Sequence, residues 1–414
     1  MSLTDLDLPT MPTGEIPHIH SHRHLVQLPA VRGEAVPALD SVIVPATRPG
    51  ASLAHAAGVA VRAGCPLVVL CSKGITAAEA VAMVRRLRRA PRVVAADVRG
   101  SDAVPGVRFR TDAHPPATQG RGDASQKRNV GLLLARMLGW RSVLFLDDDV
   151  VGMDDTRLSR TRELLAQETP GGQVQAVGWS FEAFADNSVV CHAHRSSGGL
   201  QETFIGGGGL AVRVHAGTPF FPNVYNEDWL FLHDLVARGQ VLLAGGLCQL
   251  PYDPFDHADR ASHQEFGDLF AESVFALMHH PTPRPVAADA VESLLAPAHD
   301  PDWWAGRIRF RREFVGSIAA RGAARGWTDA SPVVRSLAGA RRTLDGITPT
   351  ALVAYTAAWR EDLRTWGDVL AGLPLTDLRR ALDLLRLEGV GDVQSRRVRF
   401  SGRGVAGSRA PSRQ

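Results

Sequence analysis

The sequence predicts an α/β protein with a mixed β-sheet at its centre and an α-helical region toward its C-terminal end. Between residues 41 and 149, short runs rich in Val, Leu and Ile alternate with helical stretches. Continuous apolar strands that alternate with helices are typical of a parallel sheet covered by helices on both faces. After about residue 285 only helical periodicity is visible. A chain of 414 residues is long enough to bury a large core in one or two domains.

The first half of the predicted domain contains four strands joined by three helices. The run at 41–49 ends in a Pro-bounded turn, and the helix at 125–140 leads directly into the strand at 142–149. If the strands are parallel, their carboxyl ends share one edge of the sheet, where ligands bind in open α/β folds. We expect strands over residues 41–49, 66–74, 91–98 and 142–149, and helices over 52–63, 76–90 and 125–140.

The second half is predicted to be mixed, because the regular alternation weakens after residue 170. We expect strands over 173–181, 188–196, 206–214 and 240–250, helices over 226–239 and 262–280, and C-terminal helices over 300–324, 349–372 and 374–389. The chain accordingly divides into an N-terminal extension (1–39), an α/β domain (40–284, with halves 40–150 and 151–284), a helical region (285–394) and a basic tail (395–414).

The charge distribution gives no sign of a nucleic-acid-binding domain. The net charge is +3, but residues 395–414 carry six Arg and no acid, which leaves 40 Lys and Arg against 43 Asp and Glu elsewhere. The N-terminal residues lack the basic start and apolar stretch of a secretory signal, and no segment has the apolar length of a membrane span. The four cysteines show no C-x-x-C spacing. We therefore expect a cytoplasmic protein without structural zinc and without membrane insertion.

Polar residues gather at the predicted carboxyl ends of the strands. The chain has only two lysines, Lys73 and Lys127, against 44 arginines, and both lie near this edge. Ammonium and guanidinium groups are not interchangeable at phosphate sites, so both lysines are candidates for phosphate contacts, although solvated loop positions explain them equally well. The four strand ends hold Thr47 and Arg48, Ser72 and Lys73, Asp97, and the triplet Asp147, Asp148 and Asp149.

The stretch VLFLDDDVVG (143–152) is compatible with two kinds of chemistry. In one, Asp149 and Asp147 bind Mg²⁺ or Mn²⁺, which carries a nucleotide diphosphate, because these ions prefer carboxylate and phosphate oxygens. Asp148 is then a turn residue that points elsewhere. In the other, Asp147 is a nucleophile with Asp149 as its acid/base partner, since an apolar strand followed by Asp-x-Asp-x-Val also resembles the opening of a haloacid-dehalogenase-like phosphatase site.

Two later segments add polar groups to the same region. The four glycines 206–209, which include Gly207 and Gly208, allow the backbone to approach a substrate closely. About 80 residues after the triplet, Asn226, Glu227 and Asp228 open a predicted helix. Acidic residues in a first helical turn commonly serve as caps and complement the helix dipole. They also supply the base that an acceptor hydroxyl needs to lose its proton.

Five motifs, taken in order, resemble the GT-A fold glycosyltransferases of the family 2 type. They are VIVPATRP, KRNVGLLLARMLGW, VLFLDDDV, GGGGLAVRV and NEDWLFL, and the resemblance covers roughly residues 40 to 260. It implies a GT-A core that transfers a sugar from a nucleoside-diphosphate sugar, with UDP expected, to a soluble small-molecule acceptor. Inversion at the anomeric carbon is favoured. The chain lacks the Gln-x-x-Arg-Trp motif of processive synthases, which favours a single transfer.

The resemblance also assigns roles to individual residues. Asp228 would be the catalytic base, with Glu227 beside it, and Asp149 would be the direct Mn²⁺ or Mg²⁺ ligand, with Asp147 as a ribose or metal contact. Arg128 would contact the nucleotide, and Pro45 and Thr47 would border the base and ribose pocket. The candidate donor-binding residues are Pro45, Thr47, Arg48, Lys73, Asp97, Lys127, Arg128, Asp147, Asp148, Gly207 and Gly208.

The sequence departs from the family pattern at the end of the second predicted strand. Cys71-Ser72-Lys73-Gly74 stands where an acidic strand end is usual, so Asp97 is the substitute candidate for the base contact. His257 follows a predicted strand on a polar loop, where it is either a third metal ligand beside Asp147 and Asp149 or an ordinary surface residue. If His257 binds the metal and Asp228 only positions the acceptor, the reaction could retain configuration instead.

Several alternatives remain open from the sequence. A phosphatase needs a lysine downstream of the triplet, and neither lysine lies there; a nucleotidyltransferase needs a Gly-rich loop after the first strand, which PATRPGAS does not provide. A nucleotide-binding protein without turnover is a third reading. The helical region is expected to cover the acceptor side or to form a homodimer. His18, His20, His22 and His24 alternate, which on one face of a strand would suit a metal site, but an ordinary edge segment or a disordered arm is the favoured explanation.

Overall fold

The computed structural model describes residues 18–32, 38–48, 53–98, 107–114, 123–182, 184, 187–279 and 285–391. A large mixed sheet has the strand order β12-β4-β3-β2-β5-β10-β9-β11-β6, and a small sheet has the order β1-β7-β8. The strands are β1 (Val31–Arg32), β2 (Ser41–Ala46), β3 (Leu67–Cys71), β4 (Val93–Asp97), β5 (Ser142–Leu146), β6 (Val150–Val151), β7 (Gln167–Thr169), β8 (Gly172–Gln173), β9 (Ala176–Phe181), β10 (Gly209–Arg213), β11 (Val241–Gln249) and β12 (Glu388–Gly391).

The switch point of the large sheet lies between β2 and β5. Both strands are parallel to each other and to β3 and β4. The chain adds β3 and then β4 on one side of β2 and returns to place β5 on the other side. Open α/β sheets bind ligands at the carboxyl ends of strands at such a point. Beyond β5, β10 is antiparallel and β11 is parallel to β9, so the mixed second half is confirmed.

Helices cover both faces of this sheet. The helices are α1 (Leu53–Ala63), α2 (Ala77–Arg85), α4 (Ala124–Met137), α5 (Asp155–Leu165), α6 (Val189–Ser196), α7 (Glu227–Ala237), α8 (Arg260–Ala276), α9 (Val291–Leu294), α10 (Pro301–Ala323), α11 (Pro332–Gly346), α12 (Pro349–Gly372) and α13 (Leu378–Leu384). In β2, Val42 and Val44 pack in the core shared with α1, α2 and α5, whereas Ile43 packs in the core shared with α4, α7, α8 and α12. This two-sided burial explains the continuous apolar strands. No helix in the described ranges is both long enough and apolar enough to cross a membrane.

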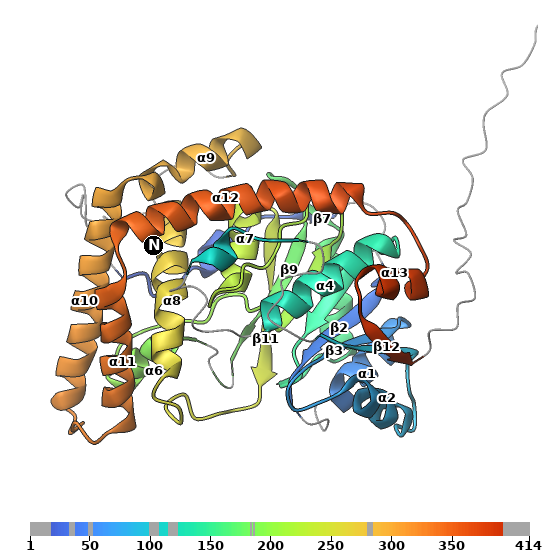
Figure 1. Cartoon of the computed structure of the whole chain (residues 1–414), viewed down its shortest axis with the longest axis horizontal. Helices are drawn as coiled ribbons and strands as arrows, with labels where there is room; N and C mark the ends of the chain where they lie inside the picture. The colour runs from blue at the N-terminus through green and yellow to red at the C-terminus, as the bar shows by residue number, and fades with distance from the viewer. Residues whose placement is uncertain are drawn as a thin grey trace, which may run out of the picture.

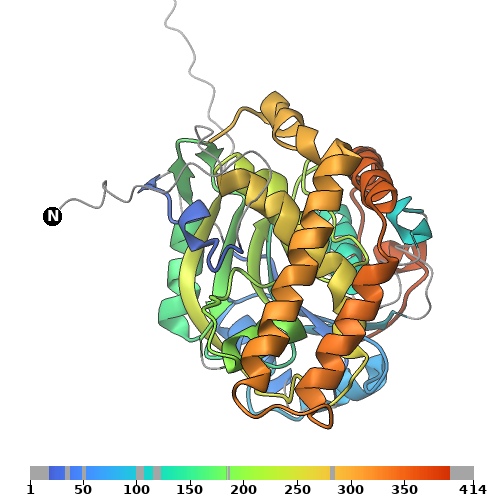
Figure 2. The same ribbon diagram turned by 90° about the vertical axis from the view of Figure 1, so that its left-hand side faces the viewer.

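The C-terminal helices are packed onto the α/β domain. Figure 1 shows α12 running along one side of the molecule, from the end where α10 and α11 lie to the end where α13 and β12 lie. Figure 2 shows α10 and α11 side by side, facing the viewer. Trp304, Trp359 and Trp366 are fully buried in the same hydrophobic core as Ile43. The region after residue 285 therefore shares its core with the sheet.

Two predictions of secondary structure are wrong. Residues 188–196 are not a strand but helix α6, which Ser188 caps by accepting a hydrogen bond from the backbone N–H of Cys191. The helix packs through Val189, Val190 and Ala193 against α10 and α11. The region after residue 285 is not exclusively helical either, because β12 pairs antiparallel with β4 at the edge of the large sheet.

Candidate functional site

The carboxyl ends of β2 and β5 are joined by Asp148. Its carboxylate accepts hydrogen bonds from the backbone N–H of Thr47 (2.8 Å) and of Arg48 (2.9 Å), and it forms an ion pair with Nη1 of Arg48 (2.7 Å). The Asp148 side chain is 3% exposed. Asp148 is thus directed at the end of β2 and fixes the two strand ends at the switch point, with Thr47 and Arg48 contributing backbone N–H groups to that junction.

Arg128 on α4 connects Asp147 with Glu227. Its Nη2 lies 2.9 Å from both oxygens of Asp147, and its Nη1 lies 2.5 Å from Oε1 of Glu227. Burial opposes the charge of Arg128, but Asp147, Glu227 and Asp228 together hold its pKa above the usual value. Nε of Arg128 is buried and has no hydrogen-bond partner within the part of the chain that the structure describes. The three sequence motifs that contain Arg128, Asp147 and Glu227 thus meet at one place.

The start of α7 places Glu227 and Asp228 against the glycine segment. The carboxylate of Asp228 accepts hydrogen bonds from the backbone N–H of Gly207 (2.7 Å) and of Trp229 (2.8 Å). Burial raises the pKa of Asp228, and burial with the nearby charge of Asp228 raises the pKa of Glu227 to about 7, although Arg128 opposes both shifts. Both carboxyl groups therefore hold a proton more readily than free ones do.

The glycines 207 and 208 are required by the closeness of these groups. A Cβ atom at Gly207 would lie 2.7 Å from Cζ of Arg128, and one at Gly208 would lie 2.8 Å from Oδ2 of Asp147. Such distances are shorter than van der Waals contact, so a larger residue would displace the ion pair. The glycine backbone therefore lies close to the protein's own side chains, whereas its close approach to a substrate stays a prediction.

Asp149 lies beside this group but has different partners. Its Oδ2 is 2.9 Å from Nη1 of Arg48 and accepts a hydrogen bond from Nε2 of Gln249 (3.2 Å). Burial and the charge of Asp147 raise the pKa of Asp149. His257 has a side chain that is 76% exposed and lies 3.8 Å from Asp256. Among the described residues, Asp147, Asp149 and His257 do not form a group with ligand atoms within 4.8 Å of one another.

The two lysines flank Asp123, a residue that the sequence analysis did not select. The Lys127 side chain is fully buried, and its Nζ donates to the carbonyl oxygen of Ala46 (2.7 Å) and lies 3.4 Å from Oδ1 of Asp123. Lys73 adopts a positive φ of 55°, and its 59% exposed side chain places Nζ 3.8 Å from the same oxygen. Lys127 therefore binds the end of β2, while Lys73 is the more accessible ammonium.

Asp97 and Pro45 have mainly structural contacts. Oδ1 of Asp97 accepts a hydrogen bond from the backbone N–H of Ala77 (2.8 Å), the first residue of α2. A carboxylate at a helix N-terminus is stabilised by the unpaired N–H groups there. Pro45 is buried within β2, where it is paired with Leu70 of β3.

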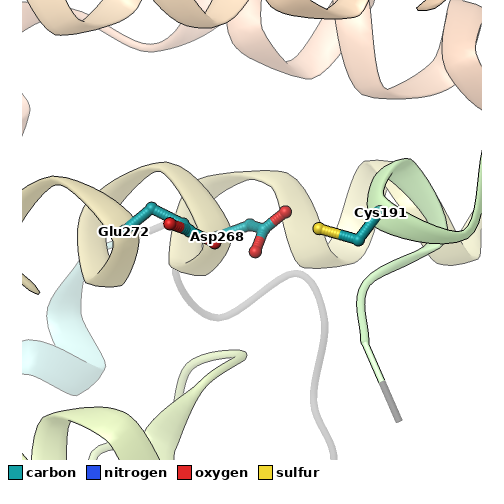
Figure 3. A group of neighbouring side chains, drawn as sticks. All are labelled: Cys191, Asp268 and Glu272. Carbon is teal, nitrogen blue, oxygen red and sulfur yellow. The ribbon is translucent and has the colours of Figure 1, made fainter. Parts of the chain in front are cut away.

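A pocket of about 160 Å³ opens next to the Arg128 ion pairs. One part of its wall carries Asp147, Glu227 and Asp228. A second wall segment includes Cys191 from α6 with Asp268 and Glu272 from α8, whose ligand atoms all lie within 4.8 Å of one another. Figure 3 shows Asp268 and Glu272 on one helix, with the Cys191 thiol directed toward Asp268.

The carboxylates on the second wall are held by hydrogen bonds and, for Asp268, by a buried ion pair with Arg311. Asp268 accepts hydrogen bonds from Oγ of Ser188 (2.6 Å) and Nδ2 of Asn226 (3.1 Å), and it lies 2.5 Å from Nη2 of Arg311 on α10. Glu272 lies 3.3 Å from Nε2 of His22. The second wall was not predictable from the ends of strands, because residues 188–196 were expected to form a strand and because Asp268 and Glu272 lie within helix α8.

The N-terminal histidines do not share one face of a strand, so the arrangement considered for a metal site is not observed there. Residues Arg23–Leu25 form a 3₁₀-helix. His22 is buried and bridges Glu272 and His279, with Nδ1 2.8 Å from Nε2 of His279. The ring of His18 stacks on Phe314 of α10. The N-terminal segment therefore contacts Glu272, one of the residues that line the pocket.

The donor groups of the site suit a hard divalent cation. The lining of the pocket includes five carboxylates, those of Asp147, Glu227, Asp228, Asp268 and Glu272, and one guanidinium, that of Arg128. Asp149 is not one of the lining residues and adds a sixth carboxylate next to the pocket through its neighbour Asp147. Mg²⁺ and Mn²⁺ prefer oxygen ligands of this kind and add positive charge where it is deficient. No known protein-family model matches the sequence, and no curated protein was found to be related to it.

Proposed function

We propose that the chain is a GT-A-type glycosyltransferase that moves a sugar from a nucleoside-diphosphate sugar, with UDP as the expected nucleotide, to a small soluble acceptor. The observation that carries the proposal is the connection of Asp147 to Glu227 through Arg128, beside the pocket that Asp228 lines. Residues about 80 positions apart meet at the switch point of the sheet, where the donor and acceptor chemistry of such an enzyme would meet.

In this proposal Asp149, with Asp147 nearby, would hold Mn²⁺ or Mg²⁺, which supplies Lewis-acid stabilisation of the departing diphosphate. Lys73 and Arg48 are exposed cations at neighbouring strand ends and would contact phosphate oxygens. The exposed His257 does not form a ligand group with Asp147 and Asp149 among the described residues. In this proposal it would bind the metal only if its loop moved toward Asp149 when the donor binds.

Asp228 would act as the base. The acceptor oxygen attacks the anomeric carbon, the bond from that carbon to the diphosphate oxygen breaks, and its electron pair leaves with the diphosphate, while Asp228 takes the acceptor proton. The backbone N–H groups of Gly207 and Trp229 orient the carboxylate. Burial raises its pKa, which makes it a stronger base than an exposed aspartate. A single displacement of this kind inverts the anomeric configuration.

The same contacts disfavour the phosphatase alternative. Both oxygens of Asp147 accept from Nη2 of Arg128, and Gly208 approaches them closely. A nucleophilic carboxylate needs an oxygen directed at the phosphorus, whereas this one is turned toward a buried guanidinium. The helical region would serve the acceptor side, since Arg311 of α10 holds the pocket residue Asp268.

Thermal unfolding with a panel of UDP-, GDP- and dTDP-sugars, each with and without Mn²⁺, tests the proposal. We expect one nucleotide class to raise the unfolding temperature only when Mn²⁺ is present, and Asp149→Asn to abolish that rise. Asp155→Asn is the matched control, because Asp155 is 83% exposed on α5 and pairs with Arg62. The absence of any Mn²⁺-dependent rise, or an equal rise in Asp149→Asn, would contradict the proposal.

A further inference from the structure

Arg48 forms an ion pair with Asp149, the carboxylate that the proposed function assigns to the metal. A single nitrogen, Nη1, lies 2.7 Å from Oδ1 of Asp148 and 2.9 Å from Oδ2 of Asp149. A divalent cation that coordinates Asp149 must therefore displace this guanidinium or share the carboxylate with it. The inference below rests on the proposed function, because it concerns how the same site receives its metal and donor.

The two contacts of Arg48 differ in how firmly the acid is held. Asp148 is fixed independently of the Arg48 side chain, since it also accepts from two backbone N–H groups at the end of β2. The carboxylate of Asp149 contacts the side chains of Arg48 and Gln249. Without the Arg48 side chain, Asp148 would still accept hydrogen bonds from the two backbone N–H groups. Asp149 would keep the hydrogen bond from the neutral amide of Gln249, which is a weaker donor than a guanidinium.

The two arginines of the site also differ in freedom. The Arg128 side chain is 4% exposed and is enclosed by Asp147 and Glu227. The Arg48 side chain is 53% exposed at the end of β2. The side chains of Asp148 and Asp149 are 3% and 7% exposed, so only the arginine of these pairs reaches solvent. A half-exposed guanidinium can exchange a carboxylate for water or another anion, whereas an enclosed one such as Arg128 would be left buried without a partner. Arg48 is therefore the guanidinium that can leave its carboxylates.

We propose that Arg48 is an exchangeable counter-ion. Without ligand it neutralises Asp149, and when the divalent cation and the nucleotide arrive it gives up Asp149 and pairs with the diphosphate oxygens. The planar guanidinium matches phosphate geometry in two hydrogen bonds, which an ammonium cannot do. Metal and nucleotide then bind with positive coupling, because each favours the state in which Arg48 has left Asp149, and coupling of this kind is reciprocal.

Isothermal titration calorimetry with Mn²⁺, with UDP, and with UDP in the presence of Mn²⁺ tests this inference on the full-length protein. Arg48→Ala removes the competitor, so we expect Mn²⁺ alone to bind about two- to fivefold more tightly than to the wild type. The same variant loses a charge-assisted contact to phosphate, so UDP with Mn²⁺ should bind about tenfold more weakly. The enhancement of Mn²⁺ affinity by UDP should therefore shrink in the variant.

Arg364→Ala is the matched control, because Arg364 is also an exposed arginine paired with one acid, Glu361 on α12. It should leave all three affinities unchanged. Arg48→Gln is a second variant, which keeps part of the side-chain stem and a neutral polar end, and it should behave like Arg48→Ala. Circular dichroism of both Arg48 variants checks that the fold is retained, as expected for a half-exposed side chain.

The outcomes separate the inference from the proposed function. If the wild type binds UDP with Mn²⁺ and the Arg48 variants show the same Mn²⁺ affinity and the same coupling, the inference is overturned and the proposed function stands. If neither the wild type nor the variants bind UDP or Mn²⁺, the proposed function fails and the inference falls with it. Tighter Mn²⁺ binding together with weaker UDP binding in both variants supports the inference.

Discussion

Replacement of Arg128 by Met is the perturbation that tests most sharply how the site is held together. Methionine keeps an unbranched apolar stem but removes the guanidinium that Asp147 and Glu227 share. The side chains of Asp147 and Glu227 are 28% and 17% exposed, so both lose much of their hydration without gaining another cation. Removal of one partner from a buried ion pair typically costs about 3–5 kcal/mol of folding free energy.

The destabilisation caused by Arg128→Met should decrease as the pH is lowered. In the folded wild type the pKa of Glu227 is raised to about 7 and that of Asp228 is raised as well. Loss of Arg128 removes the group that opposes these shifts, so the acids of the variant take up protons more readily still. Protonation relieves their repulsion, and the destabilisation of Arg128→Met should therefore be smaller at pH 5 than at pH 8.

Urea unfolding of wild type, Arg128→Met and the double variant Arg128→Met/Glu227→Gln measures this effect. The free energy of unfolding of the double variant should be about 1 kcal/mol or more above that of Arg128→Met, because one of the two carboxylates left without their cation is removed. A destabilisation of Arg128→Met below about 1 kcal/mol at pH 8, or one that is equal at pH 5 and pH 8, would refute the reasoning.

Three further predictions concern other contacts. Gly207→Ala should abolish Mn²⁺-dependent UDP binding and destabilise the fold by about 1–3 kcal/mol, whereas Gly346→Ala, where a Cβ meets nothing within 4 Å, should do neither in the same titration and urea assays. Asp362→Asn should cost about 1–3 kcal/mol in urea unfolding, because the buried Asp362 carboxylate accepts from the backbone N–H groups of Arg110 and Thr111 and from the Thr111 hydroxyl; full stability of this variant would contradict that account. The protonated form of Glu227 stabilises the fold below its ordinary pKa of 4.5, and this contribution is lost as the pH rises toward about 7. Glu227→Gln should therefore gain stability relative to the wild type between pH 4.5 and pH 7, and a constant difference would exclude this titration.

The sequence was sufficient for most of the sheet because its central strands are buried on both faces. Strands β2, β3, β4 and β5 are continuous apolar runs, and a short run of this kind between helices is compatible with few structures other than a buried strand. Helix α6 was mistaken for a strand, since VVCHAHRS satisfies a period of two as well as a helical period. Strand β12, with the sequence EGVG, carries almost no pattern of its own, and its pairing with β4 determines it.

The site could be predicted only where its residues lie near the ends of predicted strands and helices. Asp147, Arg128 and Glu227 lie in short motifs near predicted element ends, and the structure brings them into contact. The role of Asp148 could not be read from the sequence, because it depends on the direction in which a turn residue points. Pocket residues on α8 depend on tertiary packing, since any of several faces of a long helix could have met the pocket.

The central claim, that this pocket transfers a sugar with Asp228 as base, is tested most directly by proton NMR of nucleotide sugars incubated with the protein and Mg²⁺, which avoids paramagnetic broadening. A filtered small-molecule extract would supply acceptors. We predict that the donor's anomeric signal disappears with release of intact nucleoside diphosphate, and that Asp228→Asn binds UDP normally but loses at least about a hundredfold in rate. Release of inorganic phosphate from the donor, or an unchanged rate in Asp228→Asn, would contradict the claim.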